Sequence, residues 1–290
     1  MKINWLKYKT AYFLASGLLI AVSIFAIVQY GFNLGIDFLG GSLLEYYFEN
    51  KISTEQTSAI LNEHEIEVGS IVEIGDHNYL FRLGEISAEK RDEIKESLKN
   101  SAQGEVIEVR FEQVGPSIGP ELIRKTIYAI TISAGAILLW IALQFKNLRY
   151  GLAAILAMFH DSFILIGLYT ILGHYYGASL DFLFVTALLT TLSFSVHDTI
   201  VVFDRIREIK RKHGGEFEQV ANRALSETMR RSINNSITIA LMLIALIVFG
   251  GSTTVWFAAA LLIGTILGTY SSPFVAVPLL SLFNKLKVRS

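Results

Sequence analysis

The stretch SFSVHDTIVVFDRIRE, residues 193–208, decides the fold because an apolar helix leaves a membrane within it. A long apolar run begins near Phe182 and ends in the first half of this stretch, and Asp204 and Arg205 follow in the second half. Asp198 precedes that change, so it is predicted to lie inside the membrane, where a carboxylate costs about 2.5–3.5 kcal/mol. A carboxylate is normally kept there because it pairs with another group or takes part in moving an ion.

Asp198 belongs to a polar stripe on its helix. At 3.6 residues per turn, Thr191, Ser195 and Asp198 lie on one helical face. Two interpretations follow from this pattern. Asp198 either makes a structural hydrogen bond between helices or serves as a carboxylate in an ion path.

The composition is that of a membrane protein. The chain has 290 residues, of which 52% are hydrophobic and 18% charged, and its mean hydropathy is +0.47. It has no cysteine, which excludes disulfides, thiolate nucleophiles and cysteine zinc sites. Walker, Rossmann and nucleophile-elbow motifs are missing, so we expect no enzyme activity, no cofactor and no nucleic-acid partner. Any energy source is then an ion gradient or the ATPase of a partner.

Six apolar segments are long enough to cross a bilayer, which takes ~20 helical residues. They are residues 12–30, 125–144, 151–172, 182–203, 233–250 and 255–282. The first is too long for the apolar core of a cleavable signal peptide, so it is predicted to be retained. Lys and Arg occur at both ends of the chain and in alternate loops, but the loops 173–181 and 251–254 have none. The positive-inside rule therefore predicts that both termini are cytoplasmic.

Residues 31–122 are then predicted to form a domain outside the cytoplasm, between the parts 1–30 and 123–290. It carries 18 acidic and 7 basic residues. Strands are predicted at 42–49, 70–74, 78–83 and 106–114, and helices at 53–64 and 87–100, with Ser53 and Ser87 as N-caps. The order βαββαβ predicts a ferredoxin-like α+β domain.

The polar segment 204–232 is predicted to be a cytoplasmic loop with amphipathic helix. Its basic residues could contact anionic lipid, or they could act only as determinants of topology.

Two His-Asp pairs lie inside predicted spans. Span three carries His160 and Asp161, and span four carries His197 and Asp198. Neighbouring residues on a helix point about 100° apart, so both members of a pair cannot face one partner. Their spacing matches no known metal motif, and we expect no metal site.

Span five carries a second polar stripe. Arg231, Asn234, Asn235 and Thr238 follow the spacing i, i+3, i+4, i+7 from the cytoplasmic edge inward. We hypothesise that Arg231 pairs with Asp198 in one state and releases it when Asp198 takes up a proton. The alternative is that the Arg231 side chain extends to the lipid headgroups.

Span six carries packing and bending signals. Gly264 and Gly268 form a GxxxG spacing that lets helices approach closely. Ser271, Ser272 and Pro273 predict a kink, because proline removes a backbone donor.

Four motifs in this order resemble the SecD/SecF family. They are GIDFLGG at 35–41, VGPSIGPEL at 114–122, FHD at 159–161 and HDTIVVFDRIRE at 197–208. The last is close to the version found in the smaller subunits of the family. The resemblance covers nearly the whole chain.

The resemblance implies a polytopic α-helical protein with an RND-type half of six transmembrane helices in the bacterial cytoplasmic (inner) membrane. It implies a heterodimer with a SecD-type subunit, which uses the proton gradient to assist the SecYEG channel and SecA in exporting preproteins. Asp198 and Arg231 match family positions linked to proton use, and His197 stands beside them. Other membrane polar groups could support them: Asp161, His160, Asn234, Asn235, Thr191 and Ser195. The structural motif positions are Gly35, Asp37, Gly40, Gly41, Gly115 and Pro116.

His197 departs from the family pattern, because many relatives have Asn at that position. Histidine either replaces the hydrogen bond of Asn or relays protons. Two other functions are compatible with the same spans. One is a stand-alone proton-coupled exporter, and the other is a structural assembly factor of the translocon in which Asp198 and Arg231 form a static pair.

Overall fold

The computed structural model describes residues 4–74, 77–115, 118–145 and 147–288, and the chain divides into two compact units. The first unit consists of Met1–Phe32, Ala129–Leu172 and Leu183–Ser290, and the second of Asn33–Tyr128 and Gly173–Phe182. The second unit therefore includes the connection between two long helices as well as the predicted domain.

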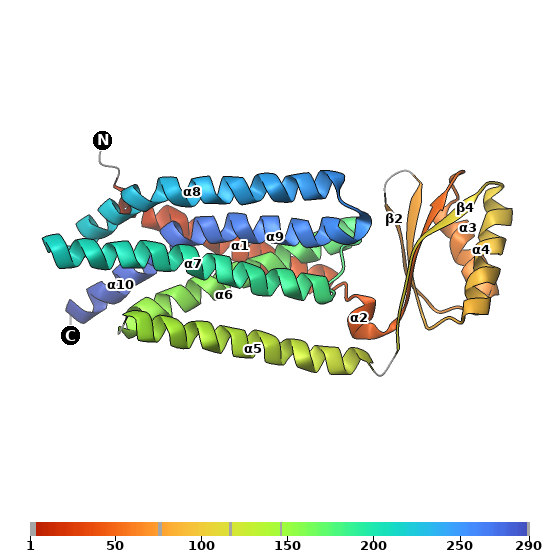
Figure 1. Ribbon diagram of the computed structural model, residues 1–290, viewed down its shortest axis with the longest axis horizontal. Helices are drawn as coiled ribbons and strands as arrows, with labels where there is room; N and C mark the ends of the chain where they lie inside the picture. Colours follow the sequence, from red (N-terminus) through yellow and green to blue (C-terminus); the bar gives the residue numbers. More distant parts are fainter. Residues whose placement is uncertain (1–3, 75–76, 116–117, 146, 289–290) are drawn as a thin grey trace. The chain divides into compact units, whose positions relative to one another are not determined.

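The described residues form ten helical elements besides the two helices that pack on the sheet (Figure 1). They are η1 (Trp5–Tyr8), α1 (Lys9–Tyr30), α5 (Ile118–Phe145), α6 (Leu148–Tyr176), α7 (Phe182–His213), α8 (Phe217–Phe249), α9 (Ser252–Ser271), η2 (Ser272–Ala276), α10 (Val277–Val288) and the short α2 (Ile36–Leu39). Within the described parts of the chain, six helical stretches are long and apolar enough to cross a membrane. The predicted six-span architecture is confirmed.

The segment 204–232 is helical almost throughout, which confirms the helix predicted there, while its cytoplasmic location stays a prediction. Helix α7 continues to His213 and α8 begins at Phe217. Apolar side chains such as Ile206 and Ile209 remain buried along these extensions. Polar residues are paired on the outside, for example Lys212 with Glu208 one turn earlier at 2.6 Å. Charge marks the end of an apolar run, but it does not end the helix.

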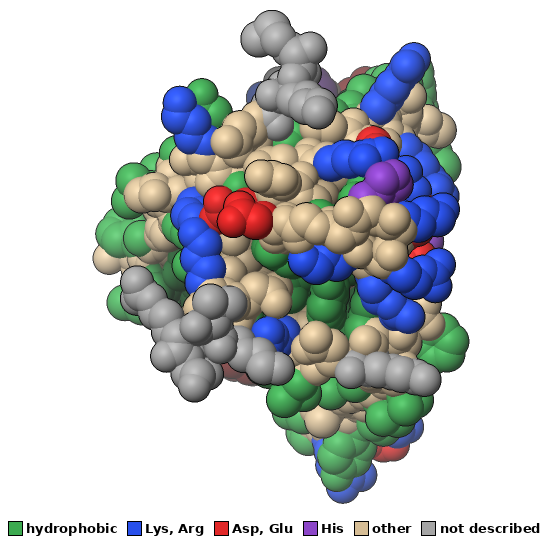
Figure 2. Space-filling view, turned by 90° about the vertical axis from the view of Figure 1, so that its left-hand side faces the viewer, with side chains coloured by type: hydrophobic (Ala, Val, Ile, Leu, Met, Phe, Trp, Pro, Cys, Tyr) green, Lys and Arg blue, Asp and Glu red, His purple; other side chains and the backbone are tan. Residues whose placement is uncertain are grey.

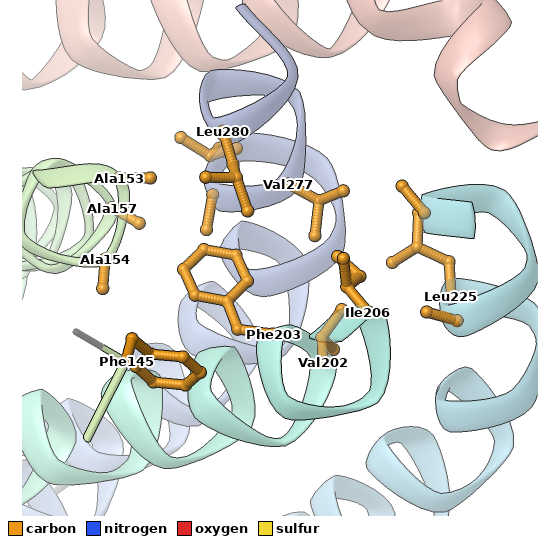
Figure 3. Packing of buried hydrophobic residues seen from close by; sticks show 14 of the residues in the cluster. Phe145, Ala153, Ala154, Ala157, Val202, Phe203, Ile206, Leu225, Val277 and Leu280 are labelled. Atoms are coloured by element: carbon orange, nitrogen blue, oxygen red, sulfur yellow. The ribbon is translucent and has the colours of Figure 1, made fainter. Parts of the chain in front are cut away.

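The core of the first unit lies where α5, α6, α7 and α10 meet (Figure 3). Alanines 153, 154 and 157 present a flat surface of α6 to this core, which lets other helices approach closely. Phe203 of α7 packs edge-on against Phe145 and Tyr150, with ring centroids 6.1 and 5.3 Å away. Val277 and Leu280 of α10 complete the cluster. This packing fixes the end of α7 that follows Asp198.

The second unit contains an antiparallel sheet with the strand order β2-β3-β1-β4. Its elements are β1 (Gly41–Phe48), α3 (Thr54–Glu63), β2 (Val68–Ile74), β3 (Asn78–Leu83), α4 (Ala88–Ala102) and β4 (Val106–Val114). The predicted βαββαβ order is confirmed. Ser53 forms a capping box with Gln56, and Ser87 accepts a hydrogen bond from the Lys90 amide. Gly75 and Asp76, which follow β2 in the sequence, lie outside the described residues.

The two faces of this sheet bury different groups. Helices α3 and α4 cover one face (Figure 1), over a core that includes Tyr46, Phe48 and Phe81. On the other face, Leu43 and Leu80 pack with Ile36, which precedes β1. Because strand side chains alternate, Arg82 of β3 shares this second face with Leu80. The GIDFLGG segment is therefore part of the fold of the sheet domain.

Candidate functional site

Asp161 of α6 is held at a junction of three helices. Its side chain is buried, with 6% exposure. The Ser195 hydroxyl of α7 donates a hydrogen bond to Oδ2 at 2.6 Å, and the Ser271 hydroxyl at the end of α9 donates to the same atom. His160 Nδ1 lies 2.8 Å from Oδ1. These donors offset much of the cost of burying a carboxylate.

The side chains of His160 and Asp161 contact each other through one carboxylate oxygen, while the other oxygen accepts from Ser195 and Ser271. With Nδ1 as the donor to Asp161, the neutral imidazole leaves Nε2 without a proton. Among the described residues, the buried Nε2 has no hydrogen-bond partner. The unsatisfied group is then a lone pair rather than an N–H. This arrangement keeps the imidazole oriented toward the carboxylate.

A proline-containing π segment brings serine hydroxyls into the junction. The helix formed by α9 and α10 is interrupted at Ser272–Ala276, so the predicted kink is confirmed. The Ser272 hydroxyl lies 2.9 Å from that of Thr199 and donates to the Ser195 carbonyl at 3.3 Å. Pro273 lacks an N–H, and π segments often occur at functional sites. The bend therefore ties α9 to α7 through polar groups.

Asp198 lies one helical turn beyond Ser195, in a more open setting. It is half-buried and faces a pocket of about 190 Å³ between α7 and α8. The pocket is lined by His197, Asp198, Val201, Val202, Thr228, Arg231, Ser232 and Asn235. This volume accommodates several water molecules, and the lining offers them polar partners. The carboxylate is therefore accessible to small polar species.

Ser232 is the hydrogen-bond partner of Asp198 in this structure. Its hydroxyl donates to Asp198 Oδ2 at 2.5 Å. Arg231 lines the same pocket, but no ion pair joins it to Asp198 within the part of the chain that the structure describes. The predicted residues Asp198, Arg231, His197 and Asn235 thus lie around one pocket, while the Asp198–Arg231 pair stays a hypothesis.

The polar face of α8 that meets its neighbours is rotated from the predicted stripe by one residue. Ser232 contacts Asp198, and the Ser236 hydroxyl lies 2.5 Å from that of Thr269 on α9. Asn234 and Thr238 are exposed. The spacing of Ser232, Asn235 and Ser236 also follows i, i+3, i+4 and was the signal for this face. Spacing alone does not distinguish this face from the predicted stripe, because Arg231, Asn234 and Asn235 follow the same i, i+3, i+4 pattern.

Helix α9 packs closely on α7 beside both carboxylates. A Cβ at Gly264 would lie 2.1 Å from Thr191 Cγ2, and a Cβ at Gly268 would lie 3.1 Å from Ser195 Cα. Thr191 is buried in this contact, and its hydroxyl donates to the Leu188 carbonyl. The predicted GxxxG pair therefore permits the approach that lets Ser271 reach Asp161.

The GIDFLGG residues form a second polar constellation, in the second unit. Asp37 Oδ2 accepts a hydrogen bond from the Phe182 amide at 2.8 Å. Gly35 packs so tightly that a Cβ would lie 2.9 Å from Asp181 Cβ. Gly40 follows the last turn of α2, and Gly41 has φ +103° beside the Leu83 carbonyl.

Of the remaining motif residues, Gly115 accepts a hydrogen bond from the Ile118 amide at 3.0 Å as α5 begins. Pro116 lies outside the described residues. Across the described ranges, no group of three or more His, Asp or Glu side chains is arranged to hold a metal ion.

Comparison with protein families agrees with this architecture. A family described as "Protein export membrane protein SecD/SecF, C-terminal" matches residues 93–286, and one described as "SecD/SecF GG Motif" matches residues 25–51. The chain belongs to the SecD/SecF family. The GG motif match includes Gly40 and Gly41 at the start of β1.

Relatives place it with the SecF-type members of the SecD/SecF family. A protein translocase subunit SecF of Thermobaculum terrenum is 39% identical over 96% of this chain and 93% of its own length. That of Anaerolinea thermophila is 37% identical over 97% and 94%. The crystal structure of SecDF, a translocon-associated membrane protein from Thermus thermophilus, superposes with a TM-score of 0.86 at 32% identity. This chain is covered to 98% in that match but spans only 39% of the SecDF chain.

Proposed function

We propose that this chain is the SecF-type subunit of a SecDF complex. The complex assists SecYEG- and SecA-dependent export across the bacterial cytoplasmic membrane by coupling proton flow to forward movement of the preprotein. The observation that supports this most is the pocket between α7 and α8, where Asp198 faces Arg231 and a serine hydroxyl. A half-buried carboxylate beside a small polar pocket in a membrane helix is the arrangement that proton-driven proteins use.

The proposed coupling step begins with ionised Asp198. In that state its charge attracts the Arg231 side chain across the pocket they share. Protonation removes the attraction, and the neutral carboxyl keeps a hydrogen bond with Ser232. Because Arg231 and Ser232 are neighbours on α8, exchanging one partner for the other shifts α8 relative to α7. A two-state contact of this kind converts proton binding into helix movement.

Asp161 has a supporting part in this proposal. It accepts hydrogen bonds from both α7 and α9 and is shielded from water. It fixes the segment of α7 one turn before Asp198, so that movement occurs at the α7–α8 contact. His160 orients Asp161 and stays outside the coupling step.

His197, the sequence neighbour of Asp198, has one of two roles, a hydrogen bond or a proton relay. Its side chain is exposed and lines the same pocket. If it only replaces a hydrogen bond of asparagine, His197→Asn leaves the pH dependence of gradient-driven export unchanged. If it relays protons, the same variant shifts that dependence.

The comparisons support a SecD-type partner for this chain, and the distribution of basic side chains supports its orientation in the membrane. The relatives that this chain matches over nearly their full length are named as SecF subunits, so we propose that a separate SecD-type subunit supplies the part of SecDF that this chain does not match. Figure 2 shows Lys and Arg side chains gathered on one end of the first unit, the end at which α10 and the α7–α8 junction lie (Figure 1). We assign this end to the cytoplasm by the positive-inside rule.

Reconstituted export tests the proposed function. The chain, a SecD-type subunit, SecYEG and SecA are placed in proteoliposomes, and preprotein export is measured with and without a proton gradient. Asp198→Asn is expected to abolish the gradient-dependent part while the complex still assembles. Asp204→Asn, an exposed carboxylate farther along α7, is the matched control and is expected to behave as wild type. An unchanged gradient response in Asp198→Asn makes Asp198 structural and favours the assembly-factor function.

A further inference from the structure

The end of α6 and the start of α7 are both capped by side chains of the sheet domain. Both caps lie within the second unit, which includes the connection Gly173–Phe182. Helix α6 bears Asp161 and helix α7 bears Asp198, so these caps act on the two helices of the candidate site.

The carboxyl end of α6 is bound by Arg82 of β3. Arg82 is buried, with 7% exposure, and its Nη2 donates to the Gly177 carbonyl at 2.7 Å. Its Nη1 donates to Asn33 Oδ1 at 3.1 Å and to the Ser70 hydroxyl at 3.0 Å. Carbonyl groups at the end of a helix lack partners within the helix, and a cation there is favoured by the helix dipole. Arg82 supplies both a hydrogen-bond donor for such a carbonyl and a positive charge at the end of the helix.

Asn33 extends this contact along the connection. Its Nδ2 donates to the Ala178 carbonyl at 2.9 Å. Its own carbonyl accepts from the Leu180 amide at 2.8 Å, and the Gly35 amide donates to the Leu180 carbonyl at 2.9 Å. Leu34 and Leu180 thereby form a parallel bridge. The connection is held through its backbone as well as by side chains.

The amino end of α7 is bound by Asp37. Its carboxylate accepts the amide of Phe182, the first residue of α7. The first amides of a helix lack partners, and an anion there is favoured by the helix dipole. A cation at the end of α6 and an anion at the start of α7 therefore match both helix dipoles from one domain.

We propose that Asn33, Asp37 and Arg82 form a clamp through which the sheet domain holds the α6–α7 connection, and that Asp37 is a positioning residue for α7 and thus for Asp198. Movement of the sheet domain then reaches the helices of Asp161 and Asp198 through their capped ends. The use of the clamp in coupling rests on the proposed function, whereas the existence of the clamp does not.

The clamp can be tested by hydrogen exchange on the chain in complex with its SecD-type partner in lipid nanodiscs. Asp37→Leu removes the acceptor, and amides in the first turn of α7 are expected to exchange roughly fivefold faster. Asp37→Asn keeps an acceptor oxygen and is expected to retain most of the protection. Arg82→Met is expected to raise exchange at residues 177–180. Ser87→Ala, which removes the N-cap of α4 in the same domain, is the control and is expected to affect α4 alone.

Export by the same variants tests whether the clamp is used. Asp37→Leu is expected to reduce the gradient-dependent part of export several-fold, with Asp37→Asn and Ser87→Ala close to wild type. Unchanged exchange in Asp37→Leu would overturn the clamp. Faster exchange with undiminished gradient-dependent export would overturn its positioning role. If Asp198→Asn also leaves the gradient response intact, the proposed function fails, and the exchange result still decides whether the clamp exists.

Discussion

Asp161 and Asp198 lie on adjacent helices of one bundle, and their surroundings indicate different roles for the two carboxylates. Asp161 is buried and has three hydrogen-bond partners, two of them on other helices, so its carboxylate links helices. Asp198 has one hydroxyl donor and an adjoining pocket, so its partners can change. A fully satisfied buried network resists rearrangement, whereas a partly satisfied one permits it. This contrast is the reason for assigning proton coupling to Asp198.

Removing a donor from Asp161 is predicted to destabilise the helix bundle. Ser195→Ala leaves a buried carboxylate with one hydrogen bond fewer, and we expect a loss of about 1–2 kcal/mol. Thermal unfolding in detergent measures this loss. Ser193→Ala on the same helix changes an exposed hydroxyl and serves as the control. Equal melting temperatures for the two variants would contradict a structural part for the Ser195–Asp161 contact.

Tyr46 gives the sheet domain a predicted sensitivity to alkaline pH. Burial raises the pKa of its phenol well above the ordinary value of 10.0, and Glu108 raises it further. A folded-state pKa above the unfolded one means that the stabilisation is complete below pH 10 and declines as pH rises past it. Within the described chain its hydroxyl has no partner, so Tyr46→Phe should cost nothing at pH 8.

Circular dichroism melts at pH 8 and pH 10.5 can compare Tyr46→Phe with wild type. We expect the variant to match or exceed wild type at pH 8 and to lose less stability at pH 10.5. Tyr79 also has a raised pKa through burial, so part of the alkaline loss persists in the variant. An identical loss in both proteins would show that Tyr46 does not titrate with unfolding.

At the scale of helices and strands, local signals were sufficient where local chemistry decides the structure. Ser53 as an N-cap predicted the start of α3, and the GxxxG spacing predicted a close helix contact. Helix was predicted within 204–232, but the positions where α7 ends (His213) and α8 begins (Phe217) were not, because buried side chains such as Ile206 stabilise these parts only in the folded bundle. The contacts of Ser232 and Arg82 were not predicted either. Their partners Asp198 and Gly177 are distant in sequence, and no spacing rule connects them.

The contact between α7 and α9 is predicted to be intolerant of added volume. Gly264→Ala places a Cβ within the space of Thr191, which forces the helices apart, and we expect a cost of about 1–3 kcal/mol. Gly135→Ala on α5 is the control, because nothing lies within 4 Å of its added Cβ. Melting temperatures in detergent compare the two. A Gly264→Ala variant as stable as the control would show that α9 does not need this approach.

For the whole molecule, the distribution of charge predicts its orientation. The basic end of the first unit carries α10 and the α7–α8 junction, whereas residues 31–122 are acidic. From this asymmetry we predict that the junction lies in the cytoplasm and the sheet domain outside it.

Because the sequence has no cysteine, single cysteines report this orientation cleanly. Glu216→Cys, between α7 and α8, is predicted to react with a membrane-impermeant maleimide only in inverted vesicles. Glu55→Cys on α3 is predicted to react only in cells whose outer envelope is permeabilised and whose cytoplasmic membrane stays closed. Both positions are exposed. Labelling of both from the same side would rule out a single membrane-inserted orientation with the sheet domain outside.

Proton movement through Asp198 is best tested by measuring proton flux itself. The complex would be reconstituted in vesicles that enclose SecA, the preprotein and a pH-sensitive dye, so that the interior corresponds to the cytoplasm, and acidification of the interior would be followed while SecYEG and SecA export the preprotein. We predict that wild type and Asp204→Asn show proton entry that accompanies export and that Asp198→Asn shows none. Proton entry in Asp198→Asn at the wild-type rate would contradict the assignment and place the coupling site elsewhere in the complex.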